Sequence, residues 1–234
     1  MKNNSGIKKT LVIGHRGAKS YALENTIESI KKAIALKTDV IEVDIRLTKD
    51  KVPILMHDRR VDRTTDGKGK VSKLTLKQIK KLNNGGERVP TLNQILKDFK
   101  DVQFNLDVKE YESTLPILKL IYKHKAEKRI LISSFKLSVL DLINKFNPQI
   151  KIAYLYHFPF CNPIRVAKRL KVEALHPHYL LVTKRLVKKA HEINVRVNPY
   201  GVKNPETAEK LINKGVDGLI IDDPKLLKKV KNGK

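Results

Sequence analysis

The chain of 234 residues contains one cysteine, no tryptophan and no long apolar run. The single cysteine, Cys161, excludes an internal disulfide and any zinc site that is built on several thiolates. No stretch approaches the roughly 20 apolar residues that a membrane-spanning helix needs. The polar N-terminus leads into the apolar segment 11–13, which is too short for the core of a signal peptide. We therefore expect a cytoplasmic protein.

Acidic residues are scarce: 24 Asp and Glu stand against 49 Lys and Arg, so the formal net charge is +25. Such an excess favours anionic partners, which include phosphate compounds, nucleic acid and acidic lipid surfaces. The lysines are spread over nearly every expected helix rather than gathered in one patch, which argues against nucleic acid. We expect a small-molecule phosphate ligand, and the charge is also compatible with peripheral contact with an anionic membrane. Nothing in the sequence predicts an oligomeric state.

Apolar segments that suit strands alternate with amphipathic segments along the chain. Eight expected strands begin at Leu11, Val40, Val102, Arg129, Ile150, Val172, Val195 and Asp217. Apolar residues at helical spacing predict helices between them, near 27–34, 92–99, 115–124, 137–146, 163–170, 183–192 and 205–213, and a last one over 224–230. Repeated strand–helix units indicate a parallel sheet, and eight of them predict a closed (β/α)₈ barrel, the TIM barrel. The alternative, a doubly wound open sheet, is disfavoured because no glycine-rich dinucleotide turn follows the first strand.

We expect one domain over residues 1–234, with a small insertion after the second strand, at about 58–90. A short strand over 52–56 precedes the insertion. Residues 58–75 contain Asp-Gly and Gly-Lys pairs among several polar residues, a composition typical of loops. A short helix over 76–82 follows. The insertion is therefore predicted to be an irregular excursion from the barrel.

The second expected strand carries an unusual pair of carboxylates. Glu42 and Asp44 share one face of a strand whose other residues, such as Val43 and Ile45, are apolar. A strand of this composition is typically buried on both faces of a parallel sheet. Two buried carboxylates side by side need a compensating charge, and a bound cation is the simplest one. The alternative is an acidic strand face that is exposed to solvent.

Other polar residues follow the same rule of position, since they occur where expected strands end. The chemistry of a (β/α)₈ barrel lies at the carboxyl ends of its strands. The residues placed there are His15, Glu42, Asp44, His57, Asp107, Lys109, Ser133, Ser134, Tyr200, Asp222 and Asp223. This shared position predicts that they surround one site.

These residue types suit the displacement of a phosphodiester. Glu42, Asp44 and Asp107, with no thiol nearby, suit a hard divalent cation such as Mg²⁺ or Ca²⁺, and Mn²⁺ is a further candidate. His15 and His57 can serve as the general base and the general acid near neutral pH. Two cationic side chains complete the set by offering donors to phosphoryl oxygens, and they are Arg16 and Lys109.

The order of short motifs along the chain resembles the glycerophosphodiester phosphodiesterase family. The motifs are His15-Arg16-Gly17, Glu24-Asn25-Thr26, Glu42-x-Asp44, Thr48-Lys49-Asp50, His57-Asp58, Arg63-Thr64-Thr65, Pro90-Thr91-Leu92, Asp107-x-Lys109, Ser134-Phe135 and Gly215-Val216-Asp217-Gly218. They extend over residues 12–224. The resemblance implies a TIM barrel with an insertion after strand 2 and a divalent cation on the three carboxylates. It also implies an acid–base pair of two histidines, with Arg16 and Lys109 on the phosphate. The implied products are glycerol 3-phosphate and an alcohol.

Four of the positions that depart from the family pattern are Leu23, Asp107, Tyr200 and Lys203. Leu23 replaces the usual proline, and Asp107 replaces a glutamate as the third metal ligand. Tyr200 and Lys203 occupy the positions of a tryptophan and an asparagine, so the resemblance implies that Tyr200 forms the aromatic wall over the substrate's glycerol. These changes leave open two other functions: a diesterase that acts on lysophospholipids or phosphoinositides, and a barrel that binds phosphorylated ligands or nucleic acid without turnover.

Overall fold

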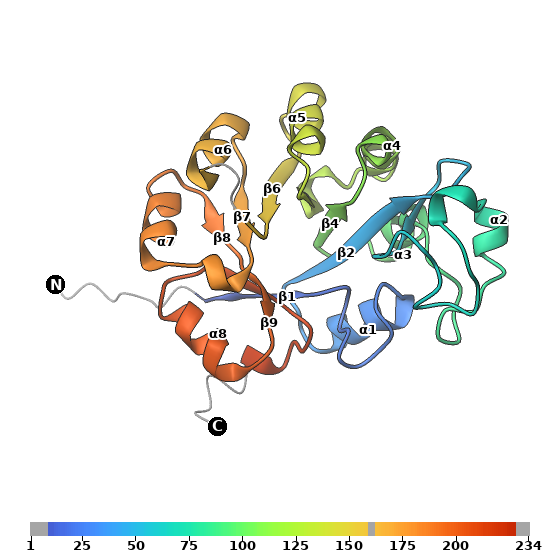
Figure 1. Ribbon diagram of the computed structural model, residues 1–234, viewed down its shortest axis with the longest axis horizontal. Helices are drawn as coiled ribbons and strands as arrows, with labels where there is room; N and C mark the ends of the chain where they lie inside the picture. The colour runs from blue at the N-terminus through green and yellow to red at the C-terminus, as the bar shows by residue number, and fades with distance from the viewer. Residues whose placement is uncertain (1–8, 159–161, 228–234) are drawn as a thin grey trace.

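The computed structural model describes residues 9–158 and 162–227. Parallel strands occupy its centre and helices surround them (Figure 1). The strands are β1 (Leu11–Gly14), β2 (Val40–Leu47), β3 (Pro53–Leu55), β4 (Phe104–Val108), β5 (Ile130–Ser134), β6 (Lys151–Tyr156), β7 (Ala174–Pro177), β8 (Arg196–Val197), β9 (Tyr200–Val202) and β10 (Gly218–Ile221). The α-helices are α1 (Ile27–Ala35), α2 (Leu76–Ile79), α3 (Leu92–Asp98), α4 (Thr114–Lys123), α5 (Leu137–Phe146), α6 (Pro163–Leu170), α7 (Lys184–His191) and α8 (Pro205–Ile212). Cys161 and the end of the helix expected over 224–230 lie outside the described residues.

The sheet closes on itself. Pairing runs β8-β7-β6-β5-β4-β2-β1-β10-β9, and β8 and β9 belong to one extended segment. This segment pairs with β7 through β8 and through a bridge between His178 and Tyr200. On its other side, the amide of Ile220 donates to the carbonyl of Pro199 at 2.9 Å, and β9 pairs with β10. The predicted (β/α)₈ barrel is confirmed.

One expected strand is divided. The sequence predicts a continuous strand over 195–200, whereas the structure ends β8 at Val197 and begins β9 at Tyr200. Pro199 lies between them, and proline has no N–H group with which to continue a ladder of hydrogen bonds. The chain bends there, which brings Tyr200 to the carboxyl end of the barrel.

Several of the outer helices begin with a capping side chain. Thr26, Thr91 and Thr183 each accept a hydrogen bond from the amide three residues ahead, in α1, α3 and α7 respectively. Asn162 and Asn204 cap α6 and α8 in the same way, and a proline follows each of them at the first helical position. Such caps satisfy amides that the helix itself leaves unpaired. They fix the helix starts on the same face of the barrel as the strand ends.

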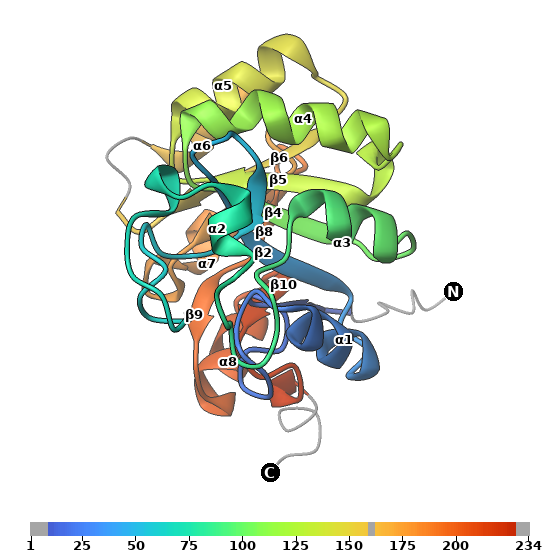
Figure 2. The same ribbon diagram turned by 90° about the vertical axis from the view of Figure 1, so that its right-hand side faces the viewer.

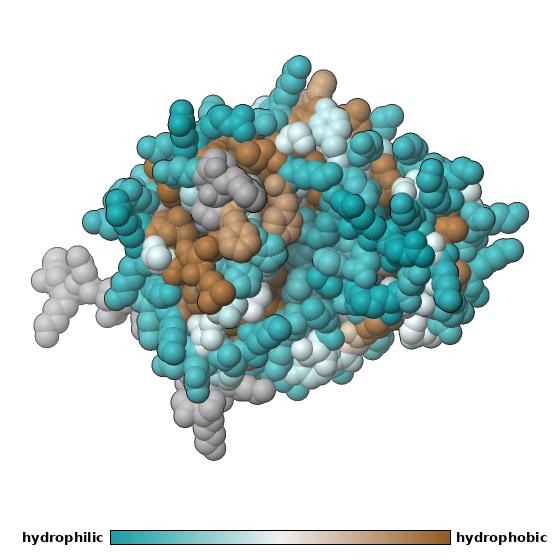
Figure 3. Space-filling model, in the orientation of Figure 1, coloured by the Kyte–Doolittle hydropathy of each residue, from teal (hydrophilic) through white to brown (hydrophobic). Residues whose placement is uncertain are grey.

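Hydrophilic side chains dominate the face of the molecule seen in Figure 3, in keeping with the net charge of +25. Within residues 9–158 and 162–227, every helix is too short or too polar to cross a membrane.

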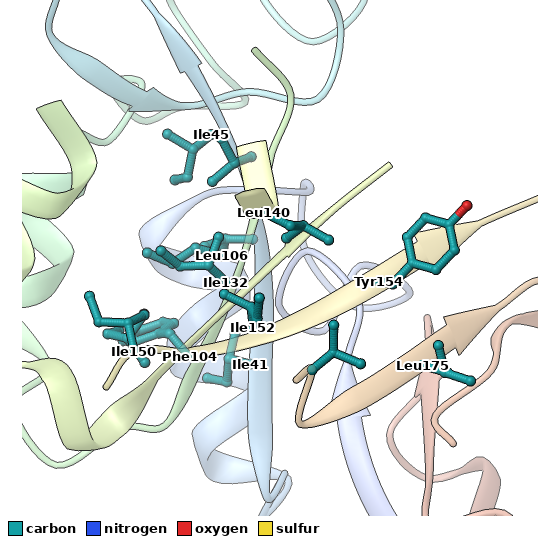
Figure 4. Packing of buried hydrophobic residues seen from close by; sticks show 14 of the residues in the cluster. Ile41, Ile45, Phe104, Leu106, Ile132, Leu140, Ile150, Ile152, Tyr154 and Leu175 are labelled. Carbon is teal, nitrogen blue, oxygen red and sulfur yellow. The ribbon is translucent and has the colours of Figure 1, made fainter. Parts of the chain in front are cut away.

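The main hydrophobic core lies between the barrel and its helices. In β2 and β4 the outward-facing residues alternate with inward-facing ones, so Ile41, Ile45, Phe104 and Leu106 belong to the buried hydrophobic cluster that also contains Leu140 of α5 (Figure 4). The inward-facing positions carry polar residues instead, and these are Glu42, Asp44, Asn105 and Asp107. Alternation in a strand therefore separates a dry outer layer from a polar interior at one end of the barrel.

The insertion after β2 has a small core of its own. β3 pairs antiparallel with β2, and the chain then leaves the barrel until α3. Figure 1 shows this part beyond β2, and Figure 2, viewed from that side, shows α2 in front of β2. Its buried side chains are Ile54, Met56, Val61, Val71, Ile79 and Val89. The predicted insertion is confirmed, and residues 58–75 are mostly irregular, with one short 3₁₀ turn, η1 (Val71–Lys73).

The helix expected over 76–82 is shorter in the structure, because α2 ends at Ile79. The amides of Lys81 and Leu82 donate to carbonyls three residues back rather than four. The last turn therefore tightens into a 3₁₀ conformation, which is common at helix ends.

Candidate active site

A cavity of about 280 Å³ opens at the carboxyl ends of the barrel strands. The eight residues to which the sequence assigns a role in catalysis, substrate binding or metal binding all line it: His15, Arg16, Glu42, Asp44, His57, Asp107, Lys109 and Tyr200. Ser133 lines it as well, whereas Ser134, Asp222 and Asp223 do not. The eight residues come from five different strands or strand ends, and residues far apart in sequence meet only because the barrel closes. The geometry therefore brings these eight residues together, and the role of each stays a prediction.

Three buried carboxylates form the floor of this cavity. Asp44 of β2 pairs in register with Asp107 of β4, and Glu42 lies two residues before Asp44 on the same face. Each offers an oxygen within 4.8 Å of the others. Burial, and then the charges of Asp44 and Asp107, raise the pKa of Glu42 well above its ordinary value. The cluster therefore needs positive charge in order to stay ionised.

Two cationic side chains supply part of that charge. Nζ of Lys109 lies 2.6 Å from Oδ1 of Asp44 and also contacts Asp107, and Nε of Arg16 lies 3.2 Å from Oδ2 of Asp44. Burial alone would raise the pKa of Asp44, but the charges of Lys109 and Arg16 hold it below its ordinary value. Two positive charges do not balance three carboxylates, so the cluster can accept a further cation.

The donor set fits a hard divalent cation. Oδ1 of Asp107 is buried and has no hydrogen-bond partner within residues 9–158 and 162–227, and the same holds for Oδ1 of Asn105 and Oγ of Ser133. All three residues line the cavity. Carboxylate, amide and hydroxyl oxygens are the ligands that Mg²⁺ and Ca²⁺ prefer. Glu42, Asp44 and Asp107 are the residues that could hold such an ion.

A tight turn after β1 brings Arg16 to the carboxylates. Arg16 and Gly17 both adopt positive φ, at 54° and 87°. A Cβ at Gly17 would lie 2.4 Å from Oγ of Ser29, so only glycine fits there. The turn also directs the backbone amide of Arg16 at Oε2 of Glu42, 2.9 Å away. The His15-Arg16-Gly17 motif is thus explained by the geometry of the chain as well as by side-chain chemistry.

Each of the two histidines is held by a carboxylate at Nδ1. Nδ1 of His15 lies 2.6 Å from Asp222, at the end of the last barrel strand, and Lys19 contacts the other oxygen of that carboxylate. Nδ1 of His57 lies 2.6 Å from Asp58. A carboxylate at Nδ1 fixes the ring and leaves Nε2 available for proton transfer. Burial lowers the pKa of His57 below its ordinary value, against the opposing charge of Asp44.

An arginine from the insertion connects the two sides of the site. Arg63 donates to Asp58 at 2.6 Å and to Glu24 at 2.5 Å, and Glu24 also accepts from Arg16 at 2.8 Å. The hydrogen bond from Arg63 is the main cause that lowers the pKa of Asp58 to about 2. The insertion therefore supplies His57 and also the residue that orients its partner.

An aromatic wall forms the opposite side of the cavity. The ring of Tyr200 lies 5.3 Å from His157 and 6.2 Å from Phe135 between centroids. The Tyr200 hydroxyl lies 2.7 Å from Nδ1 of His157. Burial, and then the charge of Asp107, raise the pKa of Tyr200, so the hydroxyl stays protonated. This wall consists of aromatic rings, whereas the floor consists of carboxylates.

Residues 15–226 match the model of the glycerophosphoryl diester phosphodiesterase family. A glycerophosphodiester phosphodiesterase of Caldanaerobacter subterraneus subsp. tengcongensis is 38% identical over 234 residues, which cover 94% of this chain and 96% of that protein. This chain belongs to the glycerophosphoryl diester phosphodiesterase family. The resemblance inferred from the motifs is confirmed, and so is the expectation of an enzyme of the phosphoric diester hydrolase class at the level of its family.

Solved structures agree with this assignment. An Oleispira antarctica phosphodiesterase, solved in complex with the product sn-glycerol-3-phosphate, superposes with a TM-score of 0.89 at 25% identity, covering 95% of this chain and 96% of that one. A glycerophosphodiester phosphodiesterase from Thermotoga maritima superposes with a TM-score of 0.83 at 26% identity, covering 95% and 98%.

Sequence reasoning missed two contributors to this phosphodiesterase site, Asn25 and Asn105, and it placed a third, Ser133, at a strand end. Asn25 is buried and holds Asp44 from two sides, since its Nδ2 donates to Oδ2 of Asp44 at 2.9 Å and its Oδ1 accepts from the amide of Asp44 at 3.0 Å. Asn105 faces inward from β4 beside Glu42, and Ser133 lies beside Asp107. The strand alternation that identified Asp107 also points to Asn105, whereas no local pattern points to the pairing of Asn25 with Asp44.

Proposed function

We propose that this chain hydrolyses glycerophosphodiesters to glycerol 3-phosphate and an alcohol. The observation that carries the proposal is that one cavity is lined by three carboxylates, two histidines and two cationic side chains. The family assignment supports it, as does the sn-glycerol-3-phosphate bound to the Oleispira antarctica relative. A binding protein without turnover has no need of paired histidines that are each oriented by a carboxylate, which disfavours that alternative.

Glu42, Asp44 and Asp107 hold a divalent cation in this proposal, with Mg²⁺ and Ca²⁺ as the first candidates and Mn²⁺ as the third. Such a cation, when bound, supplies Lewis-acid stabilisation of charge on a phosphoryl oxygen. Arg16 and Lys109 border the carboxylates and donate hydrogen bonds to the non-bridging oxygens of the phosphodiester. Tyr200 packs against the glycerol.

The two histidines divide the proton transfers between them. The lowered pKa of His57 keeps it neutral at pH 7, as a general base requires. Nε2 of His57 accepts the proton of the substrate glycerol's own hydroxyl, whose oxygen bonds to phosphorus. The bond from phosphorus to the alcohol oxygen breaks, and His15 gives its proton to that oxygen. Water then opens the cyclic phosphate with the two roles reversed.

Release of glycerol 3-phosphate from glycerophosphocholine and glycerophosphoethanolamine tests the reaction. The assay is run with EDTA, Mg²⁺, Ca²⁺ or Mn²⁺ on the native protein and on His15→Ala. His124→Ala is the matched control, because His124 lies at the end of α4 and contacts Asn93 rather than the cavity. We expect release that needs a cation, that His15→Ala abolishes and that His124→Ala retains. If the native protein releases nothing under any condition, the proposal is wrong.

A substrate with a good leaving group separates the acid from the base. Glycerophospho-p-nitrophenol needs little help from an acid, because its leaving phenolate is stable. His15→Ala is therefore expected to recover much of its activity on this compound, whereas His57→Ala stays inactive on it. Equal loss in both variants on both substrates would contradict the division of roles.

We also infer that residues 1–234 act as one domain in the cytoplasm. The insertion supplies His57 and Arg63 to a site whose floor lies in the barrel, which supports a single functional unit. One cooperative unfolding transition, seen alike by far-ultraviolet circular dichroism and by loss of activity, is the expected result. Cell fractionation tests the location.

A further inference from the structure

One part of the rim around the cavity differs in character from the rest. It consists of the segments that follow β5, β6 and β7, together with the first turns of α5, α6 and α7. The described residues of these segments are 135–140, 157–158, 162–166 and 178–187, and we call them the β5–β7 rim. Because each begins at the carboxyl end of a strand, all three lie on the catalytic face of the barrel.

Large apolar side chains of this rim are exposed to solvent. Leu180 has 72% of its surface exposed, Phe158 has 71% and Phe135 has 42%. The ring of His157 connects Phe135 and Phe158 with the segment that carries Leu180, since its centroid lies 5.5 Å from Phe135, 6.5 Å from Phe158 and 5.4 Å from His178. Figure 3 shows an apolar area on this face, with hydrophilic side chains around it. Exposed apolar groups clustered beside a cavity indicate an interaction surface.

The same rim carries only positive charge. Its sequence contains no Asp or Glu, and it has four basic residues: Lys136, Arg165, Lys184 and Arg185. All four are exposed. The segments after β1, β2 and β4 differ, because acidic residues there, such as Glu24, Asp58 and Glu110, are engaged in ion pairs with arginines. The apolar part of the catalytic face is therefore cationic and free of acidic side chains.

We propose that the β5–β7 rim docks on lipid bilayers that contain anionic phospholipids. Phe158 and Leu180 enter the interface between head groups and acyl chains, and the four basic residues contact the lipid phosphates. A surface that is apolar at its centre, basic at its edge and without acids is complementary to this partner. The net charge of +25 attracts the whole molecule to an anionic surface in addition. In this orientation the cavity opens toward the bilayer.

This inference adds a partner to the proposed function, and its test needs no turnover. Sedimentation with vesicles measures binding of the full chain in EDTA, where a cation-dependent reaction cannot proceed. Phosphatidylcholine vesicles are compared with vesicles that also contain phosphatidylglycerol. The variants are Phe158→Ser with Leu180→Ser, and Lys136→Ser with Lys184→Ser. The control is Phe146→Ser, because Phe146 is 59% exposed but ends α5, away from the catalytic face.

We expect the native protein to bind only when phosphatidylglycerol is present. The apolar double variant should lose roughly tenfold or more in affinity for the vesicles, since it lacks the two apolar side chains that enter the bilayer. The lysine double variant should bind more weakly and lose its remaining affinity at lower salt, while Phe146→Ser should bind like the native protein.

Three results would overturn the inference: no vesicle binding, equal losses in Phe146→Ser and the apolar double variant, or binding that responds to the lysines alone. The last result would indicate adsorption by charge without docking. Each of these outcomes leaves the proposed hydrolysis intact, because glycerol 3-phosphate release from soluble diesters is measured separately.

Discussion

Asn25→Gly is expected to weaken the site's hold on a cation without straining the backbone. Asn25 is buried, adopts a left-handed conformation at φ 58°, and grips both the carboxylate and the amide of Asp44. Glycine accepts that φ readily, so the substitution removes the amide group and little else. Asp44 then loses the contacts that hold it in the orientation shared with the other two carboxylates.

The magnitude follows from the two hydrogen bonds. A hydrogen bond to an ionised carboxylate contributes about 1.5–3 kcal/mol to stability, and one to a neutral amide contributes about 1 kcal/mol. Asn25→Gly should therefore lower the free energy of unfolding by about 2.5–4 kcal/mol. Asn25→Ala should cost about 1–2 kcal/mol more, because alanine is strained in the left-handed region. Loss of a residue that orients a metal ligand typically weakens the metal affinity about 10–100-fold.

Urea denaturation measures the stability, and isothermal titration calorimetry measures the affinity for Mg²⁺, Ca²⁺ and Mn²⁺. Asn194→Gly is the matched control, since Asn194 also has positive φ, at 57°, but is exposed and does not line the cavity. It should change neither quantity appreciably. If Asn25→Gly loses stability while the cation affinity stays within about twofold of native, Asn25 does not orient a metal ligand and this reasoning is refuted.

Three further predictions concern charge and backbone. Lys109→Met removes an ammonium group from between two carboxylates, so calorimetry should show tighter cation binding while glycerol 3-phosphate release falls about 10²-fold or more; a parallel loss of both would indicate a structural role alone. Burial would raise the pKa of Asp222, but its hydrogen bond with His15 and nearby charges lower it to about 2. The ionised Asp222 carboxylate therefore stabilises the folded state above pH 4, and this contribution is lost as the pH falls toward 2. Asp222→Asn should remove about 1 kcal/mol of that pH dependence, after allowance for screening at a third-exposed carboxylate; unchanged acid-unfolding curves would contradict this. Gly17→Ala should cost roughly 3 kcal/mol or more, since the new Cβ meets helix α1, whereas Gly86→Ala, at similar φ and with open space around it, should cost only about 1–2 kcal/mol; equal costs would refute the steric argument.

The barrel was predictable from the sequence because its strands alternate so regularly. In β2 the apolar residues at 41, 43 and 45 face the helices, and Glu42 and Asp44 face the interior. The alternation of side chains along a strand is a local property, so it can be recognised without knowledge of the rest of the fold. The rule that barrel chemistry lies at strand ends then collects residues from distant segments into one site without any knowledge of contacts.

Contacts that depend on the closed fold were not predictable in this way. Asn25 meets Asp44 because the turn after β1 folds back over β2, with positive φ at two non-glycine positions, Arg16 and Asn25. Positive φ at such residues is rarely signalled by the sequence. The end of α2 at Ile79 was missed for a related reason, since helical periodicity continues beyond the point where the hydrogen bonds tighten.

The ion pairs of the site explain why its parts depend on one another. Arg16 forms ion pairs with Asp44 and Glu24. Arg63 forms ion pairs with Glu24 and with Asp58, and Asp58 is the partner of His57. The barrel floor and His57 are thus connected by one series of ion pairs of alternating charge. Removal of Arg16 would leave the buried carboxylates of Asp44 and Glu24 each with one cationic partner fewer, and a buried charge that loses a partner is costly. The insertion therefore positions His57 through this network, which is a reason for the barrel to carry an insertion after β2 and next to the carboxylates.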